Sequence, residues 1–412
     1  MKVVHLGIGV IPVPPPGDIA AGGEEYVYVL TRYLSRLECE VHVIDIKGGA
    51  QQREKRQQSS AKFHELWRLP LPYRYRHRFL RRYLNYLLTA SQTLLFAVIA
   101  AFSLNRLLAK EKIDIVHVHN ENVALAAIIV NKLRRNNTIT VYTPFSAYGL
   151  TKFSWRKRLI YFAEIPTLRW IDHIVASTPS VKQWMISEFN LDPAKITQIR
   201  AGGTDLDEVE GFLFHKEGVC HQSNMVLCAG GIMERKNQLT AVKAMAKVVS
   251  VHPEVKIVFT GPFSQVNYFN SIQSFVTENG LSSYVELRGE VTKQELYSLY
   301  SDAILFLFPT TAEVDPAVLR EALAFGLPII ASNIEPIADM VGKGEGSAIL
   351  LDPYDVDGIA EAVIRLLEDN SLRQSMSEKA KELGQALSYE NIAAQILAMY
   401  NKLVQGKKGG RD

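Results

Sequence analysis

The segment FPTTAEVDPAVLREALAFGLPIIAS, residues 308–332, decides how the second half of the chain folds. It starts at the end of an apolar run, passes through a polar loop into helix-forming residues, and returns through Gly-Leu-Pro to another apolar run. Asp315 is a favourable N-cap and Pro316 fits the first helical position, so we expect a helix to begin there. A strand, a helix and a second strand in this order predict a parallel βαβ unit.

Two glutamates in this segment, Glu313 in the loop and Glu321 in the expected helix, have seven residues between them. Glu278 and Glu286 have the same separation without such a setting, so the spacing alone decides nothing. A loop carboxylate and a helix carboxylate beyond a strand end are suited to bind two parts of one polyhydroxylated ligand. The alternative is an exposed helix with ordinary surface charges.

Two turns have the composition of an anion site. In AGGIMERKNQ (229–238), Gly230 and Gly231 follow a strand, and Arg235 and Lys236 precede a helix. Cations at that position oppose the helix dipole, and a bound anion would remove the conflict. In the segment quoted first, the amides of Ala317 and Val318 would likewise face an anion.

Short apolar runs alternate with helix-period segments along the whole chain, which predicts parallel sheets covered by helices on both faces. We expect an α/β protein of two doubly wound domains facing across a cleft: residues 1–203, a linker at 204–224, residues 225–388, and a helix at 389–405 that crosses back. The expected strands are 3–6, 40–46, 113–119, 138–144, 173–178, 195–200, 225–231, 256–262, 285–290, 304–309, 328–332 and 348–353.

Composition agrees with this class. A chain of 412 residues is too long for one ordinary core, and 47% hydrophobic with 22% charged residues is typical of globular proteins. Three cysteines, Cys39, Cys220 and Cys228, lack metal-ligand spacing, so we expect reduced thiols and a cytoplasmic location. The N-terminus has the pattern of a first strand rather than of a signal peptide.

The net charge of +3 is unevenly distributed, because residues 53–82 contain ten Lys or Arg and only two Glu. This segment suggests peripheral contact with an anionic membrane surface, with a solvated face as the alternative. Nucleic acid is not expected, since no other binding motif accompanies the charge. Residues 87–104 are long enough to span a membrane, but interrupting polar residues favour a buried helix.

The loop after the first expected strand ends in Gly22 and Gly23, ahead of an amphipathic segment. Glycines allow backbone to approach a ligand, and the helix start offers free amides. The alternative is a flexible turn that caps the helix. It is not a dinucleotide fingerprint, because Gly7 and Gly9 lack a third glycine at the required offset.

Together these motifs resemble the family 4 retaining glycosyltransferases, which have the two-domain GT-B architecture. The resemblance covers nearly the whole chain. It implies that Lys236 contacts the diphosphate of a nucleotide-sugar donor, that Glu313 contacts the sugar hydroxyls, and that Glu321 contacts the nucleotide ribose. Gly22, Gly23 and Glu25 correspond to the acceptor-side glycine loop.

Two departures from the family pattern concern the reaction centre. Gly231 stands where the family commonly has an arginine that pairs with the diphosphate, and Arg235 is a candidate substitute. Phe145 stands where the family commonly has a histidine, and phenylalanine transfers no proton. His119, at the end of the expected strand 113–119, is the nearest alternative; a merely structural histidine is the competing interpretation.

We therefore expect an enzyme that moves a sugar from a nucleotide diphosphate to a hydroxyl of a glycan, lipid-linked or small-molecule acceptor. No metal or cofactor is expected, since the helix amides and Lys236 are suited to stabilise the departing diphosphate. A sugar-nucleotide-binding scaffold without turnover remains an alternative, which Gly231 and Phe145 favour. A nucleotide-sugar epimerase is a third.

Overall fold

The computed structural model describes residues 1–9, 11–15, 22–67, 81–135, 138–144, 167–215, 224–313, 315–342 and 346–409. The chain forms two compact units. Unit 1 comprises Met1–Gly202 together with Tyr389–Asp412, and unit 2 comprises Gly203–Ser388. The fold class predicted from the sequence is confirmed, since each unit is built on its own parallel sheet.

Unit 1 contains a seven-stranded sheet in the order β3-β2-β1-β4-β5-β6-β7, with every neighbouring pair parallel. Its strands are β1 (Lys2–Leu6), β2 (Glu40–Ile46), β3 (Lys62–Leu66), β4 (Ile115–Val118), β5 (Ile139–Tyr142), β6 (His173–Ala176) and β7 (Ile196–Gln198). Its helical segments are α1 (Gly22–Arg36), α2 (Ala50–Gln57), α3 (Arg81–Lys110), α4 (Glu121–Arg134), α6 (Pro179–Phe189), η2 (Pro193–Lys195) and α15 (Tyr389–Gly409). The strand order reverses between β1 and β4, which is where such sheets bind ligands.

Unit 2 contains a six-stranded parallel sheet in the order β10-β9-β8-β11-β12-β13. The strands are β8 (Met225–Ala229), β9 (Lys256–Thr260), β10 (Val285–Gly289), β11 (Leu305–Phe308), β12 (Ile329–Ser332) and β13 (Ala348–Leu351). The helical segments are α7 (Leu206–His215), η3 (Glu234–Lys236), α8 (Gln238–Val251), α9 (Val266–Glu278), α10 (Lys293–Asp302), α11 (Ala317–Ala324), α12 (Glu335–Val341), α13 (Val356–Glu368) and α14 (Asn370–Ala386). Here the order reverses between β8 and β11.

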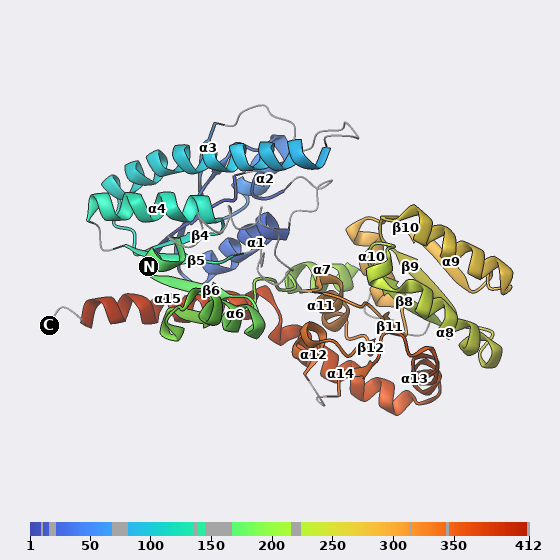
Figure 1. Ribbon diagram of the computed structural model, residues 1–412. Coiled ribbons are helices and arrows are strands. Elements are labelled where there is room, and N and C mark those ends of the chain that lie inside the picture. The colour runs from blue at the N-terminus through green and yellow to red at the C-terminus, as the bar shows by residue number, and fades with distance from the viewer. Residues whose placement is uncertain are drawn as a thin grey trace. The chain divides into compact units, whose positions relative to one another are not determined.

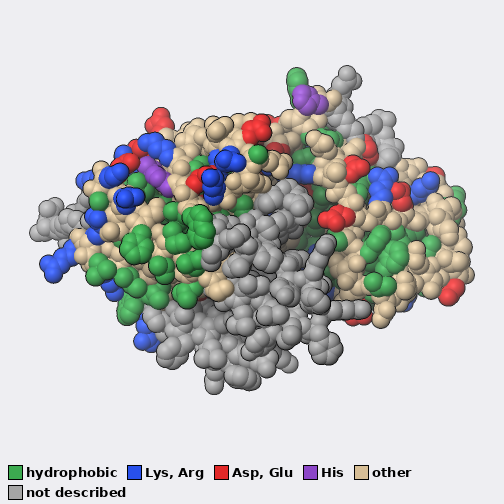
Figure 2. Space-filling view, turned by 90° about the horizontal axis from the view of Figure 1, so that it is seen from above, with side chains coloured by type: hydrophobic (Ala, Val, Ile, Leu, Met, Phe, Trp, Pro, Cys, Tyr) green, Lys and Arg blue, Asp and Glu red, His purple; other side chains and the backbone are tan. Residues whose placement is uncertain are grey.

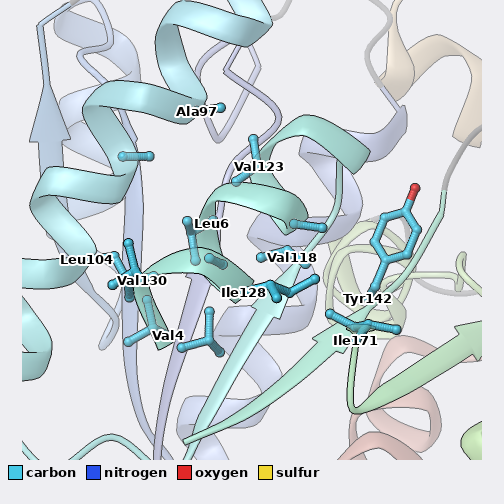
Figure 3. Packing of buried hydrophobic residues seen from close by; sticks show 14 of the residues in the cluster. Val4, Leu6, Ala97, Leu104, Val118, Val123, Ile128, Val130, Tyr142 and Ile171 are labelled. Atoms are coloured by element: carbon cyan, nitrogen blue, oxygen red, sulfur yellow. The ribbon is translucent and has the colours of Figure 1, made fainter. Parts of the chain in front are cut away.

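The central strands of unit 1 are buried on both faces because alternate residues enter different cores. On one face, side chains of β1 and β4 pack against α3 and α4, as Figure 3 shows for Val4, Leu6, Ala97, Val118 and Ile128. On the other face, the intervening residues of the same strands pack against α1 and α15. Figure 1 shows α3 and α4 side by side over their face of the sheet.

All twelve predicted strands are present, but β3 was missed. Lys62–Leu66 lies in the basic segment. Its charged residues interrupt the apolar run that indicates a strand, so this short edge strand was not predicted. The interval 204–224 is also more than a linker, because α7 occupies part of it. Phe212 of α7 stacks edge-on against Tyr297, with ring centroids 5.7 Å apart, so apolar packing places this helix in unit 2. The final helix does return to unit 1, where α15 packs against α1.

Candidate functional site

Three neighbouring strands of unit 2 end at glycines with positive φ. The values are 140° for Gly230 after β8, 137° for Gly261 after β9, and 74° for Gly289 at the end of β10. The Gly230 amide donates to the Thr260 carbonyl, and the Gly261 amide donates to the Gly289 carbonyl. Because residues with a Cβ rarely adopt such angles, only glycine lets these three chain ends stack so closely.

Gly261 gives a direct test of this stacking, because a Cβ there would lie 2.4 Å from the Gly230 carbonyl oxygen. We expect Gly261→Ala to lower the free energy of unfolding of unit 2 by about 3 kcal/mol or more, from backbone strain and overpacking. Gly280→Ala is the matched control: its φ is +67° but nothing lies within 4 Å of its added Cβ. That change should cost only about 1 kcal/mol. Equal urea-unfolding losses in the two variants would contradict the stacking.

Beside the Gly230 turn, two cations and a hydroxyl converge on one carboxylate oxygen. Oε1 of Glu313 lies 2.5 Å from Nζ of Lys236, 2.9 Å from Nη1 of Arg235 and 3.1 Å from Oγ1 of Thr310. Nη1 of Arg235 also donates to the Ala312 carbonyl. Among the described residues these three contacts all involve Oε1 of Glu313.

The Lys236 side chain is held against the end of the sheet. Its ammonium lies 4.9 Å from the centroid of the Phe308 ring, and a Cβ on Gly230 would lie 3.5 Å from its Nζ. Only 12% of the side chain is exposed, compared with 44% for Arg235. Lys236 is therefore the more strongly oriented of the two cations.

Asn237, which was not among the predicted site residues, holds this turn in place. Its φ is +57°, and its buried side-chain amide donates to the carbonyls of Pro309 and Pro353 at 3.1 and 2.6 Å. Its Oδ1 accepts from Thr240. The turn after β8 is thus tied to chain segments that follow β11 and β13. The asparagine directly after Arg235 and Lys236 could have indicated this turn, since asparagine tolerates left-handed backbone.

Helix α11 begins at Ala317, one residue later than predicted, and Pro316 occupies the N-cap position. The prediction that Asp315 caps the helix was wrong: its carboxylate pairs with Arg320 instead. Because Pro316 takes the N-cap position, Asp315 lies one residue before the helix, and its carboxylate reaches the Arg320 guanidinium. The amides of Ala317 and Val318 belong to the first turn, where no carbonyl within the helix lies four residues earlier.

Glu321 is held separately from the Glu313 cluster, on the second turn of α11. It accepts a 3.1 Å hydrogen bond from the Tyr300 hydroxyl of α10. Burial raises the pKa of Glu321, while the charge of Lys293 acts in the opposite direction. The structure thus brings together Arg235, Lys236 and Glu313, and places Glu321 on the adjacent helix.

At Gly231, where the family pattern has arginine, the ends of flexible side chains occupy the space that a larger residue would need. An added Cβ would lie 3.0 Å from Oγ of Ser264 and 3.3 Å from Cε of Met233. Both are side-chain ends that can rotate away. The position is compatible with a larger residue only if Ser264 and Met233 move.

In unit 1, Gly22 and Gly23 form the first residues of α1 rather than a loop before it. Glu25 lies in the first turn and is partly exposed, whereas Glu24 is buried. Burial raises the pKa of Glu24 to about 7, with a smaller contribution from the charge of Asp45. Residues 16–21, and with them most of the predicted acceptor-side loop, lie outside the described part of the chain.

His119 lies in the interior of unit 1, with 3% of its surface exposed. Its Nε2 is 3.1 Å from Nδ1 of His5, and burial holds its pKa well below the usual range. Neighbouring His117 lies between the Tyr400 hydroxyl of α15 and the Thr143 hydroxyl, at 2.5 and 2.7 Å. A neutral, enclosed imidazole favours the structural interpretation of His119 over the catalytic one. Phe145 lies outside the described residues.

Arg56 belongs to the basic segment 53–82, but it is an interior residue. Its guanidinium contacts Asp45 and Glu65, each at 2.7 Å, and its Nε donates to the Val13 carbonyl. Asp45 also accepts from the Val13 amide. This network fixes the segment after β1 against β2 and β3, so Arg56 is not available to an external anion.

Comparison with known proteins follows the two-unit division. Residues 20–203 match the family described as Glycosyltransferase Family 4, and residues 211–383 match the family described as Glycosyl transferases group 1.

Among curated relatives, the chain is 28% identical over 239 residues to a D-inositol 3-phosphate glycosyltransferase of Paenarthrobacter aurescens, covering 57% of this chain and 58% of that protein. It is 26% identical over 278 residues to an Escherichia coli UDP-Gal:alpha-D-GlcNAc-diphosphoundecaprenol alpha-1,3-galactosyltransferase, covering 66% and 70%. The match thus spans little more than half the length of the first of these relatives.

Solved structures of similar fold include a sucrose-phosphate synthase from Thermosynechococcus elongatus, with TM-score 0.68, 20% identity, and coverage of 98% of this chain and 99% of that one. Anabaena HepE in complex with UDP and glucose gives TM-score 0.66 and 16% identity, covering 97% and 99%. At these identities the likeness establishes the fold.

Proposed function

The chain belongs to the family 4 glycosyltransferases of GT-B fold, and from that premise we propose that it transfers a sugar from a nucleotide diphosphate to an acceptor hydroxyl with retention of anomeric configuration. The observation that carries the proposal is the convergence of Arg235, Lys236 and Thr310 on Glu313. These side chains lie beyond the carboxyl ends of β8 and β11, the strands between which the sheet order reverses.

In the proposed reaction, the diphosphate binds between Lys236 and the first-turn amides of Ala317 and Val318. As the bond from the anomeric carbon to the diphosphate oxygen breaks, the acceptor hydroxyl oxygen bonds to that carbon from the same face, and its proton passes to the departing phosphate. Negative charge develops on the leaving oxygen during this step. The ammonium and the helix N-terminus stabilise that charge without reorganising. Oε2 of Glu313 accepts hydrogen bonds from the sugar hydroxyls, and Glu321 binds the ribose.

Arg235 has a positioning role in this proposal. Its guanidinium is bound to Glu313 and the Ala312 carbonyl, so it orients the carboxylate rather than replacing the arginine absent at Gly231. Lys236 and the helix amides then hold the diphosphate without metal. A single ammonium gives less geometric control than a guanidinium fork.

For the donor we propose a uridine diphosphate sugar, because one relative is named for UDP-Gal and HepE was solved with UDP. For the acceptor we propose a glycan, in particular a lipid-linked one, as in the name of the E. coli relative. The enzyme would act in the cytoplasm at the membrane surface. Within the basic segment 53–82, Arg56 is buried and is not available to a membrane, whereas residues 68–80 lie outside the described part.

Thermal unfolding with a panel of nucleotide diphosphates and their sugar derivatives tests the donor proposal. A ligand at 100 times its Kd stabilises the folded state by about 2.7 kcal/mol, which raises Tm by about 5–11 °C for a unit of this size. We expect UDP or a UDP-sugar to give the largest increase. Lys236→Ala should lose most of it, whereas Lys247→Ala, an exposed cation on α8 paired with Asp357, should keep it. An unchanged Tm with every nucleotide would overturn the proposal.

A sugar-nucleotide-binding scaffold is the second candidate, and Gly231 is the observation that favours it. The same panel separates the two when combined with a donor-hydrolysis assay. A nucleotide-dependent increase in Tm, without hydrolysis or transfer to any membrane or glycan extract, would support the scaffold.

A further inference from the structure

Helix α3 has a large apolar residue at every fourth position of one face. Leu94, Val98 and Phe102 are 59%, 50% and 73% exposed. The opposite face of the same helix is buried in the unit 1 core through Phe96 and Leu104. Side chains four residues apart are neighbours on a helix, so these three form one outward stripe. The residues of α3 between Ser91 and Lys110 thus include both buried and exposed apolar side chains.

Helix α4 extends this stripe sideways. Ile129 and Leu133, again four residues apart, are 46% and 80% exposed. The two helices pack against each other, and Nε of Arg134 donates to Oδ1 of Asn105 across the contact. We call the set Leu94, Val98, Phe102, Ile129 and Leu133 the α3–α4 surface. Figure 2 shows hydrophobic side chains gathered on this side of unit 1, with Lys and Arg and fewer Asp and Glu side chains beside them.

In the described parts of α3 and α4, the exposed charged side chains are positive. The sequence of α3 contains no Asp or Glu, and the only acidic residue of α4 is Glu121 in its first turn. Exposed cations lie toward the C-terminal ends of the two helices: Arg106, Lys110, Lys132 and Arg135. Lys132 also lies 4.4 Å above the ring of Trp170, which is half exposed. An apolar centre with cations and an indole at its edge matches a lipid interface with anionic headgroups.

We propose that the α3–α4 surface docks on an anionic lipid bilayer. Phe102, Val98 and Leu133 enter the region between headgroups and acyl chains, while the lysines and arginines bind lipid phosphates. Contiguous exposed apolar side chains are costly in water, and burial in the interface removes that cost. The inference deepens the proposed function, because a lipid-linked acceptor is reached from the bilayer surface. Vesicle binding itself requires no sugar transfer, so the two proposals can fail independently.

Flotation of the full-length protein with vesicles tests the inference. Vesicles of phosphatidylcholine alone are compared with vesicles containing phosphatidylglycerol, at low and high salt. We expect binding to the anionic vesicles that weakens with salt. The triple variant Val98→Ser, Phe102→Ser, Leu133→Ser should bind at least about tenfold more weakly, since each buried apolar side chain contributes to affinity. The control Phe214→Ser, Val251→Ser removes comparably exposed side chains from unit 2 and should bind like the wild type.

Three results would overturn the inference. The first is absence of wild-type binding to anionic vesicles, and the second is equal binding by the triple variant. The third is a concentration-dependent dimer, seen by light scattering and lost in the triple variant, without vesicle binding; the surface would then join two copies of the chain. Nucleotide-dependent Tm shifts in the triple variant report separately on the donor site and on correct folding.

Discussion

Glu313→Gln lowers kcat for sugar transfer by about 10²–10³-fold, while the affinity for the nucleotide diphosphate stays within a few-fold of wild type. The substitution keeps the shape of the side chain but removes the charge that Lys236 and Arg235 share. In the proposed mechanism the sugar loses its hydrogen-bond acceptor and the two cations lose their common partner. The diphosphate retains Lys236 and the helix amides, so binding and turnover respond differently.

Initial rates with the donor found by thermal unfolding measure this effect. Glu278→Gln is the matched control, because Glu278 and Glu286 have the same separation as Glu313 and Glu321 but lie elsewhere on the unit. Glu286 pairs with Arg288 at an exposed position. The control should keep wild-type rates. A Glu313→Gln rate within threefold of wild type would remove Glu313 from the reaction centre.

Three buried histidines make the free energy of unfolding of unit 1 depend on pH. Burial lowers the pKa of His5 to about 3 and holds those of His117 and His119 well below the usual value near 6.5. Below pH 6.5 these histidines bind protons in the unfolded chain but not in the folded one, so their contribution to the free energy of unfolding falls as pH falls. Glu24 and Asp45, whose pKa values burial raises to about 7, act in the opposite direction, because they bind protons first in the folded chain. Each such histidine contributes up to about 1.4 kcal/mol per pH unit, and three together about 4 kcal/mol.

Calorimetry between pH 7.5 and pH 5 measures this loss, with the two units assigned by nucleotide-induced shifts of the unit 2 transition. Replacing His5 with leucine should remove about one third of the histidine contribution, which is about 1.4 kcal/mol per pH unit below pH 6.5. The control His252→Gln, in unit 2, should leave the slope of unit 1 unchanged. An unchanged pH dependence in the His5→Leu variant would show that His5 accepts a proton in the folded state.

The sequence predicted the architecture well because parallel strands buried on both faces form short apolar runs. The strand Lys62–Leu66 was not predicted, since an edge strand with two charged residues has no such apolar run. The α7 interval was assigned to a linker because its first residues are acidic, although Phe212 packs inside unit 2.

For the site, strand-to-helix loops identified Lys236 and Glu313, and the structure brings them together. What could not be predicted depends on contacts between distant segments. Asn237 reaches carbonyls 72 and 116 residues away, and no local pattern encodes such partners. His119 was singled out for its place at a strand end. Its burial beside His5 and His117 depends on how α1 and α15 cover that sheet face.

The return of α15 to unit 1 has a consequence for synthesis. Unit 2 is an insertion between residue 202 and residue 389, and the Thr204 amide bonds to the Leu387 carbonyl, so both ends of the insertion meet. As the ribosome releases the chain, unit 2 is complete while unit 1 still lacks the helix that covers α1 and supplies Tyr400 to His117. Unit 1 begins to be translated first and is therefore the last unit to finish folding. A premature stop codon that removes α15 would destabilise unit 1.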